Sequence, residues 1–209
     1  VLSPSTVTHI EKNFDIDPAK VTALHWGIRL DLIDQVCERV EIEALKEQYG
    51  LSAASKVIFA PRGLRPVFRP IGRLVEILAP LMQNDKNLTV IIMMHNKEAA
   101  ELEAQINTDA QKYGVAERVI CIEEYLDYHQ AMAMFMLSDI YISLAENDET
   151  SSATLEAMYL KTIPIVSRTP TYADVFQDGQ QLFFVDNNHD VEAIRQQIGQ
   201  ILADLPQLK

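Results

Sequence analysis

The stretch VIFAPRGLRPVFRPIGRLVEILAPLMQNDKNLTVIIMM, residues 57–94, decides the fold. It begins with a short apolar run at 57–60 and ends with a longer one at 88–94, with a helical pattern at 71–82 between them. Short, almost continuously apolar strands that alternate with longer helices are typical of βα units, whose parallel sheet is buried on both faces. The stretch therefore predicts one complete βαβ unit.

The same alternation extends in both directions along the chain. Further strands are predicted at 21–25, 118–122, 140–144, 163–167 and 182–185. Further helices are predicted from Ser3-Pro4 towards Phe14 and at 31–48, 98–113, 130–137, 151–160 and 191–202. Right-handed crossovers would place these helices on both sides of the sheet. We therefore expect an α/β fold with a doubly wound parallel sheet, and a single domain over residues 1–209.

Composition excludes several classes of protein. The chain of 209 residues is 48% hydrophobic and 23% charged, as in ordinary globular proteins. Its formal charge of −12 argues against general affinity for nucleic acid. The apolar runs are too short to cross a bilayer, and no signal peptide is visible at the start. Because the chain begins without Met, within Ser-Pro, we expect it to be part of a longer protein.

Cysteine, histidine and glycine patterns exclude further chemistry. Cys37 and Cys121 have no metal-ligand spacing and are expected to be free thiols. The five histidines are scattered, so no metal site is predicted. The seven glycines form neither GxGxxG nor a P-loop, which leaves little basis for a dehydrogenase or an NTPase.

In a doubly wound sheet, ligands bind beyond the carboxyl ends of the strands, so loops that follow strands are the place to look for a site. The loop after 57–60 holds four arginines within twelve positions, in a chain that is otherwise acidic. With Pro70 as first helical residue, Arg62 and Arg69 would lie near a helix N-terminus, where anions are favoured. This indicates a phosphorylated ligand. The alternative is a solvated basic face, to which we assign Arg73.

A second unusual loop follows 140–144. It carries Asp148, then Thr150 and Ser151 at the expected start of a helix, and Glu156 inside that helix. A diphosphate could lie over the helix tip, with one carboxylate at a sugar and the other at a ribose. A good N-cap followed by an incidental Glu is the competing interpretation.

These motifs together resemble the C-terminal domain of the retaining glycosyltransferases with the GT-B fold, the "glycosyl transferases group 1" family. Asp148 and Glu156 stand in the register of the family's paired Glu residues, within a run similar to EGFGLPLLEAMA. Residues 62–69, RGLRPVFR, resemble the basic loop RGMEPYRGF of one branch. Residues 164–167 and 178–185 resemble the later G-x-P-V-V and DG…G-L-L-V segments, and 21–27 the V…NG segment that follows the interdomain crossing. The resemblance covers nearly the whole chain.

The resemblance implies a role for each matching residue. Arg62 and Arg69 would hold the diphosphate of a UDP- or GDP-sugar and stabilise it as leaving group, without a metal or other cofactor. Asp148 would face the transferred sugar and Glu156 the ribose. Four further residues would bind the donor: Gly63, the Ser151 and Ser152 amides, and, near the base, Tyr125 in the loop 123–125.

The resemblance also implies partners, and the departures from it keep an alternative open. Residues 1–50 would follow the interdomain crossing, 51–209 would be the core, and the glycan or lipid-linked acceptor would bind to an absent N-terminal domain. The resemblance implies a cytoplasmic location and, through that absent half, a peripheral place at the inner membrane face. Asp148 replaces a Glu, and Lys161 stands where the family has Gly. A non-catalytic module that partners an active enzyme is therefore the second hypothesis.

Overall fold

A parallel sheet forms the centre of the molecule in the computed structural model, which describes residues 3–25, 27–61, 73–94, 100–146, 148–186 and 190–208. Its strands are β1 (Lys56–Ala60), β2 (Leu88–Met93), β3 (Val119–Ile122), β4 (Ile140–Ser143), β5 (Ile163–Ser167) and β6 (Phe183–Val185). The six strands are arranged in the order β3-β2-β1-β4-β5-β6, and every pair is parallel. Along the chain, β2 and β3 are therefore added on one side of β1, and β5 and β6 are added on the opposite side, beyond β4.

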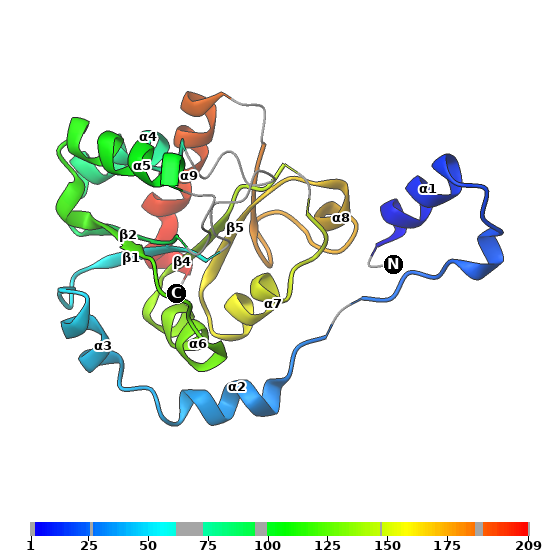
Figure 1. The fold of residues 1–209 in the computed structure, drawn as a ribbon, viewed down its shortest axis with the longest axis horizontal. Coiled ribbons are helices and arrows are strands. Elements are labelled where there is room, and N and C mark those ends of the chain that lie inside the picture. Colours follow the sequence, from blue (N-terminus) through cyan, green and yellow to red (C-terminus); the bar gives the residue numbers. More distant parts are fainter. Residues whose placement is uncertain are drawn as a thin grey trace.

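Helices cover both faces of this sheet (Figure 1). The helices are α1 (Pro4–Asn13), α2 (Leu30–Cys37), α3 (Ile42–Gln48), α4 (Leu74–Asn84), α5 (Ala100–Lys112), α6 (Tyr128–Leu137), α7 (Ser152–Tyr159), α8 (Pro170–Ala173) and α9 (Val191–Leu208). One hydrophobic cluster joins the sheet to α4, α5 and α9, and a second joins its other face to α2, α3, α6, α7 and α8. The predicted doubly wound α/β fold is therefore confirmed.

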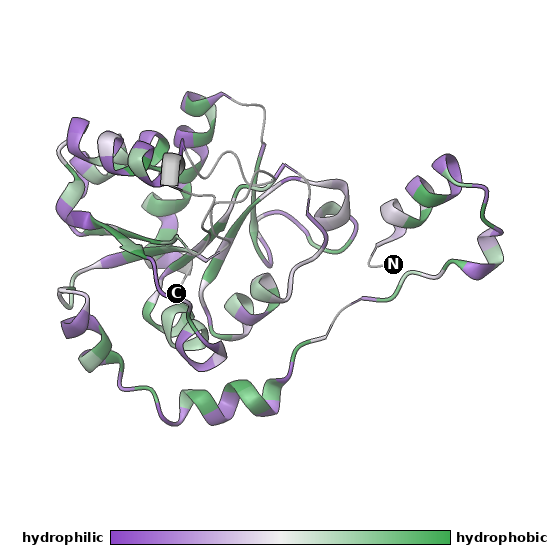
Figure 2. Cartoon of the chain, viewed as in Figure 1, coloured by the Kyte–Doolittle hydropathy of each residue, from purple (hydrophilic) through white to green (hydrophobic). Residues whose placement is uncertain are grey.

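The strands divide their side chains between the two clusters. Ile58 and Ala60 of β1 belong to the first cluster, and Val57 and Phe59 to the second. All four are at most 2% exposed, because both faces of β1 are covered. Figure 2 shows the same pattern for the sheet as a whole, whose strands are predominantly hydrophobic. This burial on both faces explains why the sequence runs are continuously apolar instead of alternating.

Two predicted elements differ from the structure. The predicted strand at 21–25 is irregular backbone that joins no sheet. The predicted helix at 31–48 is two helices, α2 and α3, with a break at 38–41. Ile33, Val36 and Val40 pack at helical spacing, but the next core residue, Ile42, follows after only two positions. A straight helix would turn the second apolar stripe away from the sheet, and the break lets both stripes face it.

Most other element boundaries agree with prediction to within about three residues, and α9 is six residues longer than expected. The short helix α8 was not predicted. It begins with Thr169 as N-cap and Pro170 as the first helical residue, a common helix start that is too short to show a periodic pattern. As predicted, Cys37 and Cys121 are free thiols.

Lys161 ends α7 in a left-handed conformation, with φ of 63°. The Thr162 amide donates to the Ala157 carbonyl, and the Lys161 amide donates to the Met158 carbonyl. These two bonds form a Schellman motif, in which the left-handed residue is usually Gly. Among the described residues, Lys161 is the only one other than Gly with positive φ. The position where the family has Gly is therefore a left-handed cap, occupied here by a residue that is strained there.

Helix α1 lies to one side of the sheet, beside α8 (Figure 1). Two long-range hydrogen bonds connect it to the loops after β4 and β5. The Thr6 hydroxyl donates to Glu149 Oε1 at 2.6 Å, and the Ser5 amide donates to Asp174 Oδ2 at 2.7 Å. Residues 14–25 and 27–29 then lead back along the outside of the molecule to α2. The start of the chain thus reaches the carboxyl edge of the distant strands β4 and β5.

Candidate functional site

The strand order makes the neighbouring carboxyl ends of β1 and β4 the topological switch point of the sheet. These two strands are neighbours, yet their connections leave in opposite directions across the sheet. Doubly wound folds bind ligands in the crevice at such a switch point. The two loops singled out in the sequence are the ones that follow β1 and β4. The sheet therefore places the points where both loops begin on neighbouring strands.

Three of the predicted residues, Arg62, Gly63 and Arg69, lie outside the described residues. What the structure gives is their point of departure, since β1 ends at the fully buried Ala60. Arg73, assigned above to the solvated face, forms an ion pair with Glu76 at 2.9 Å. That assignment is consistent with an exposed helical pair at three-residue spacing.

The tip of α7 is built largely as expected, with one difference. Ser151 is the N-cap, and its hydroxyl accepts from the Thr154 amide at 3.2 Å. The Ser151 amide donates to the buried hydroxyl of Tyr172 on α8, so it has an internal acceptor. Ser152 is exposed at the first helical position, where amides have no acceptor within the helix. Of the two predicted amides, Ser152 is therefore the better placed to bind an anion.

A buried polar cluster supports this tip. Tyr172 is 2% exposed, and its hydroxyl is 2.8 Å from the Thr154 hydroxyl as well as bonded to the Ser151 amide. Burial raises the pKa of Tyr172 to about 12, with smaller effects from Tyr141 and Asp148. The phenol therefore stays neutral and holds α7 against α8. None of these contacts was predicted from the sequence.

Glu156 lies on α7, half-buried, beside Tyr128 at the start of α6. The Tyr128 hydroxyl donates a hydrogen bond to its carboxylate. Burial raises the pKa of Glu156, and the bond from Tyr128 lowers it in part. Burial also raises the pKa of Tyr128 to about 12, helped by the negative charge of Glu156. A half-buried carboxylate with one bond from a phenol retains acceptor capacity for a ligand hydroxyl.

Tyr125 lies in the loop between β3 and α6, three positions before Tyr128, and is 70% exposed. Because β3 is an edge strand, this loop starts two strands away from β1. Tyr128 is therefore the aromatic residue of this region that touches a predicted site residue. Sequence reasoning missed it because it lies beyond the candidate loop 123–125, and only the packing of α6 on α7 brings it to Glu156.

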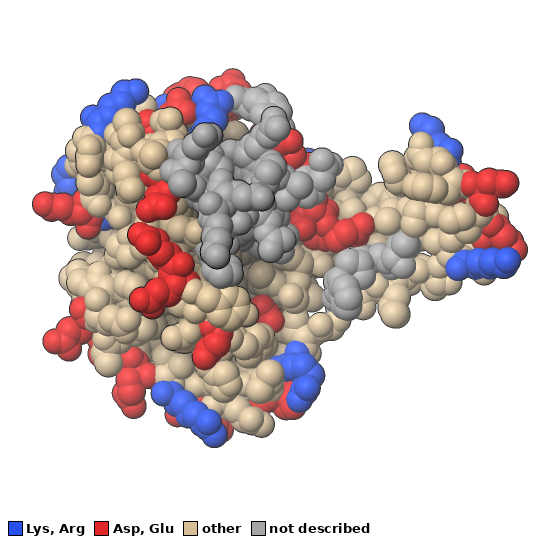
Figure 3. Space-filling view, viewed as in Figure 1, with Lys and Arg blue, Asp and Glu red and all other residues tan. Residues whose placement is uncertain are grey.

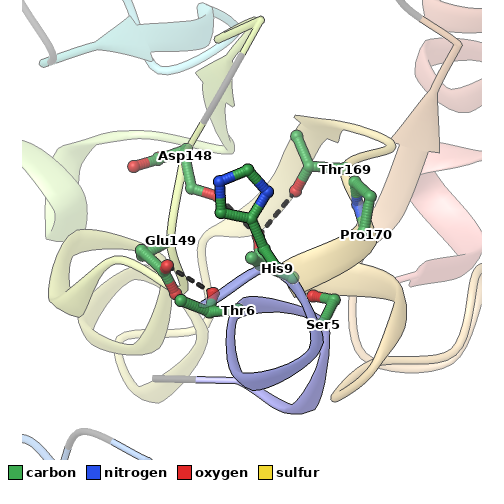
Figure 4. A pocket seen from close by; sticks show the side chains of 8 residues that line it. Ser5, Thr6, His9, Asp148, Glu149, Thr169 and Pro170 are labelled. Carbon is green, nitrogen blue, oxygen red and sulfur yellow. Dashed lines mark hydrogen bonds between the residues drawn. The ribbon is translucent and has the colours of Figure 1, made fainter. Parts of the chain in front are cut away.

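Asp148 lines a pocket with a volume of about 590 Å³ between α1 and the loops after β4 and β5. The described residues that line it are Ser5, Thr6, His9, Asp148, Glu149, Thr169, Pro170 and Thr171 (Figure 4). The Thr171 hydroxyl donates to the Asp148 carbonyl at 2.5 Å, which fixes the loop. The pocket lies on the side of the loop that faces α1, and Glu156 lies on the helix beyond it. Within the described part of the chain, no group of metal-ligating side chains is found.

Fold and site together define an α/β protein with a Rossmann-like parallel sheet and a candidate ligand site at its switch point. The chain belongs to the family "Glycosyl transferases group 1", whose model matches residues 41–209. The predicted family is thereby confirmed. No curated protein sequence matches the chain. Among the described residues, no helix combines the length and apolarity needed to cross a membrane.

Solved glycosyltransferases share the fold. A glycosyltransferase from Rickettsia africae ESF-5 superposes with a TM-score of 0.83 at 18% identity, covering 99% of this chain and 54% of that protein. Anabaena Alr3699/HepE, solved with UDP and glucose, gives 0.78 at 16% identity, covering 99% and 53%. The C-terminal domain of a group 1 glycosyltransferase from Francisella tularensis gives 0.68 at 12%, covering 80% and 85%. The chain thus spans about half the length of the first two proteins.

Proposed function

We propose that this chain is the C-terminal, donor-binding domain of a retaining glycosyltransferase. It would bind a nucleoside-diphosphate sugar in the crevice between the loops after β1 and β4. The sugar would pass, with retention of its anomeric configuration, to a glycan or lipid-linked acceptor bound by a further domain. The observation that carries the proposal is the position of Glu156. A half-buried carboxylate, bonded by Tyr128, lies behind an exposed helix tip at the switch point of the sheet.

Each part of the donor has a matching group. The ribose hydroxyls would donate to Glu156, which keeps free acceptor positions beside its bond from Tyr128. The diphosphate would lie over the tip of α7, where the Ser152 amide and the helix dipole favour negative charge. Asp148 faces a pocket on the other side of this tip, and the transferred sugar would occupy that pocket. The order of ribose, diphosphate and sugar thus follows α7 and its preceding loop.

Charge neutralisation of the departing diphosphate would drive the chemistry. When the glycosidic bond breaks, its electron pair stays with the diphosphate oxygen, and negative charge grows there. We assign Arg62 and Arg69, in the loop that follows β1, to that charge, because guanidinium forks match phosphate oxygens. Two permanent cations perform the role that a divalent metal has in other transferases, so we expect no metal requirement.

Calorimetric titration of the chain with UDP, GDP and ADP tests the proposal. We expect one nucleotide to bind selectively and both Arg62→Ala and Glu156→Ala to lose at least about tenfold in affinity, since each removes a charged partner. Arg73→Ala is the matched control, because Arg73 is paired with Glu76 and should leave affinity unchanged. Binding that is equally strong in the Glu156 variant would contradict the assigned ribose site.

The same titration addresses the second hypothesis. If folded wild-type chain binds none of the three nucleotides at millimolar concentration, the non-catalytic module becomes the better interpretation. Repeating the titration on the full protein then separates this from a site that needs its other domain. The anomeric configuration of the product, measured by NMR with the full protein, tests retention.

A further inference from the structure

The pocket beside Asp148 has walls from two distant parts of the chain. Ser5, Thr6 and His9 of α1 form one wall, and the loops after β4 and β5 form the other. Figure 4 shows these side chains converging on one space, with the ring of His9 between Asp148 and Thr169. A volume of about 590 Å³ lies within the range of small-molecule sites, roughly 300–1,000 Å³.

The chemistry of the walls is hydroxylic and acidic. Four of the described lining residues carry hydroxyls, namely Ser5, Thr6, Thr169 and Thr171, and two carry carboxylates, Asp148 and Glu149. The described lining includes no Lys or Arg. Figure 3 shows acidic atoms at the surface where the α1 arm meets the body of the molecule. A third carboxylate, Asp174, lies just beyond, bonded to the Ser5 amide. Hydroxyls and carboxylates suit a polyhydroxylated ligand, and the charge is unfavourable to an anion.

Glu149 has one oxygen still available. Its Oε1 accepts from the Thr6 hydroxyl at 2.6 Å, whereas Oε2 is buried and has no hydrogen-bond partner among the described residues. A buried carboxylate oxygen without a partner is costly, so a donor that reaches it is favoured. A hydroxyl or ammonium group of a ligand supplies such a donor. A ligand carboxylate supplies none and adds like charge.

We infer that this pocket selects sugars by charge: it takes an uncharged hexose or an amino sugar and rejects a carboxylated one. The inference rests on the proposed function, of which it specifies the sugar class. Glu149 is then a specificity-determining residue, one position after the residue that the family register assigns to the sugar. Binding of the diphosphate, which we assign to the tip of α7 and the loop after β1, does not depend on this charge selection.

Binding of UDP, UDP-glucose and UDP-glucuronic acid, compared by calorimetry at low salt, tests the inference. We expect UDP-glucuronic acid to bind about tenfold more weakly than UDP-glucose. The carboxylates of Asp148 and Glu149 repel the carboxylate of its sugar, and low salt screens this repulsion only in part. Glu149→Gln should narrow this difference at least about threefold. Glu146→Gln is the matched control, since Glu146 lies in the same loop, is exposed and does not line the pocket. Equal affinity for both UDP-sugars in the wild type would overturn the inference, even with UDP itself bound as proposed.

A second measurement does not depend on nucleotide binding. Amide NMR signals of Thr6, Glu149 and Thr171 are followed during titration with free glucose, glucosamine and glucuronate. Shifts with glucose or glucosamine but not with glucuronate support charge selection, whether or not any nucleotide binds. Shifts of equal size with glucuronate, or none with any sugar, overturn it. Failure of the nucleotide site alone would leave this pattern intact, so the two failures are distinguishable.

Discussion

Replacing Lys161 by Gly should stabilise the protein. Lys161 holds φ of 63° at the end of α7, and its side chain is exposed, so the substitution removes little packing. A left-handed conformation costs an L-residue about 1–2 kcal/mol, and this strain disappears with Gly. Against that, Gly loses about 0.5–1 kcal/mol more backbone freedom on folding. The net gain in the free energy of unfolding should be about 0.5–1 kcal/mol.

Urea unfolding followed by circular dichroism measures this gain. We expect the midpoint to rise with an unchanged slope, which is the signature of a change in stability alone. The melting temperature should rise by roughly 1–4 °C for a domain of this size. Lys161→Ala is the control, because it removes the same side chain but keeps the Cβ, and should give no such gain. Gly114→Ala makes the reverse comparison: Gly114 has φ of 66°, and the variant should lose about 1 kcal/mol. A midpoint that is unchanged or lower in Lys161→Gly would refute the strain argument.

Three further outcomes are expected. Glu156→Gln should be more stable than wild type at neutral pH, and this difference should vanish on acidification. Burial raises the folded-state pKa of Glu156, so the stability that its carboxyl group contributes is complete below the ordinary carboxyl pKa and is lost as pH rises through the raised pKa. Urea midpoints measured across pH would contradict this if the difference between the two proteins stayed constant. Arg118→Met should cost about 2 kcal/mol of stability. One guanidinium nitrogen of Arg118 donates to three main-chain carbonyls between α4 and β2, and these would lose their donor. Thermal melts measure the loss, and a value below about 0.5 kcal/mol would contradict the importance of these three hydrogen bonds. Thr6→Val should raise amide exchange across α1, because it removes the bond to Glu149; unchanged exchange would mean that this bond does not hold the helix.

The sequence predicted the sheet well because burial on both faces leaves a strong local pattern. The strands beginning near Lys56, Leu88 and Ile140 are continuously apolar and needed no tertiary information. The strand predicted at 21–25 failed for the complementary reason. It is apolar too, yet no neighbouring strand pairs with it, and periodicity cannot show whether a partner exists. The break between α2 and α3 depends on which faces reach the sheet, a property of tertiary packing.

The candidate site was predictable only in its loops. The clustered arginines and the register of Asp148 and Glu156 are local signals, and the strand order places both loops at the switch point. Contacts between distant elements left no such signal. Tyr128 reaches Glu156 through the packing of two helices, and Thr6 reaches Glu149 across 143 positions of sequence.

The strand order also divides the sheet into two halves, each made from one continuous length of chain. Residues 56–122 supply β1, β2 and β3, and residues 140–185 supply β4, β5 and β6. Among the described residues, the only strand contact between the halves is the pairing of β1 with β4, which matches two residue pairs, whereas β1 and β2 match five. The switch point, where the ligand is proposed to bind, lies at the carboxyl end of this pairing. A ligand that contacts both loops would therefore bridge the two halves where the fewest residue pairs join them. At a concentration of a hundred times its dissociation constant, it would add about 2.7 kcal/mol to the free energy of unfolding of the whole domain.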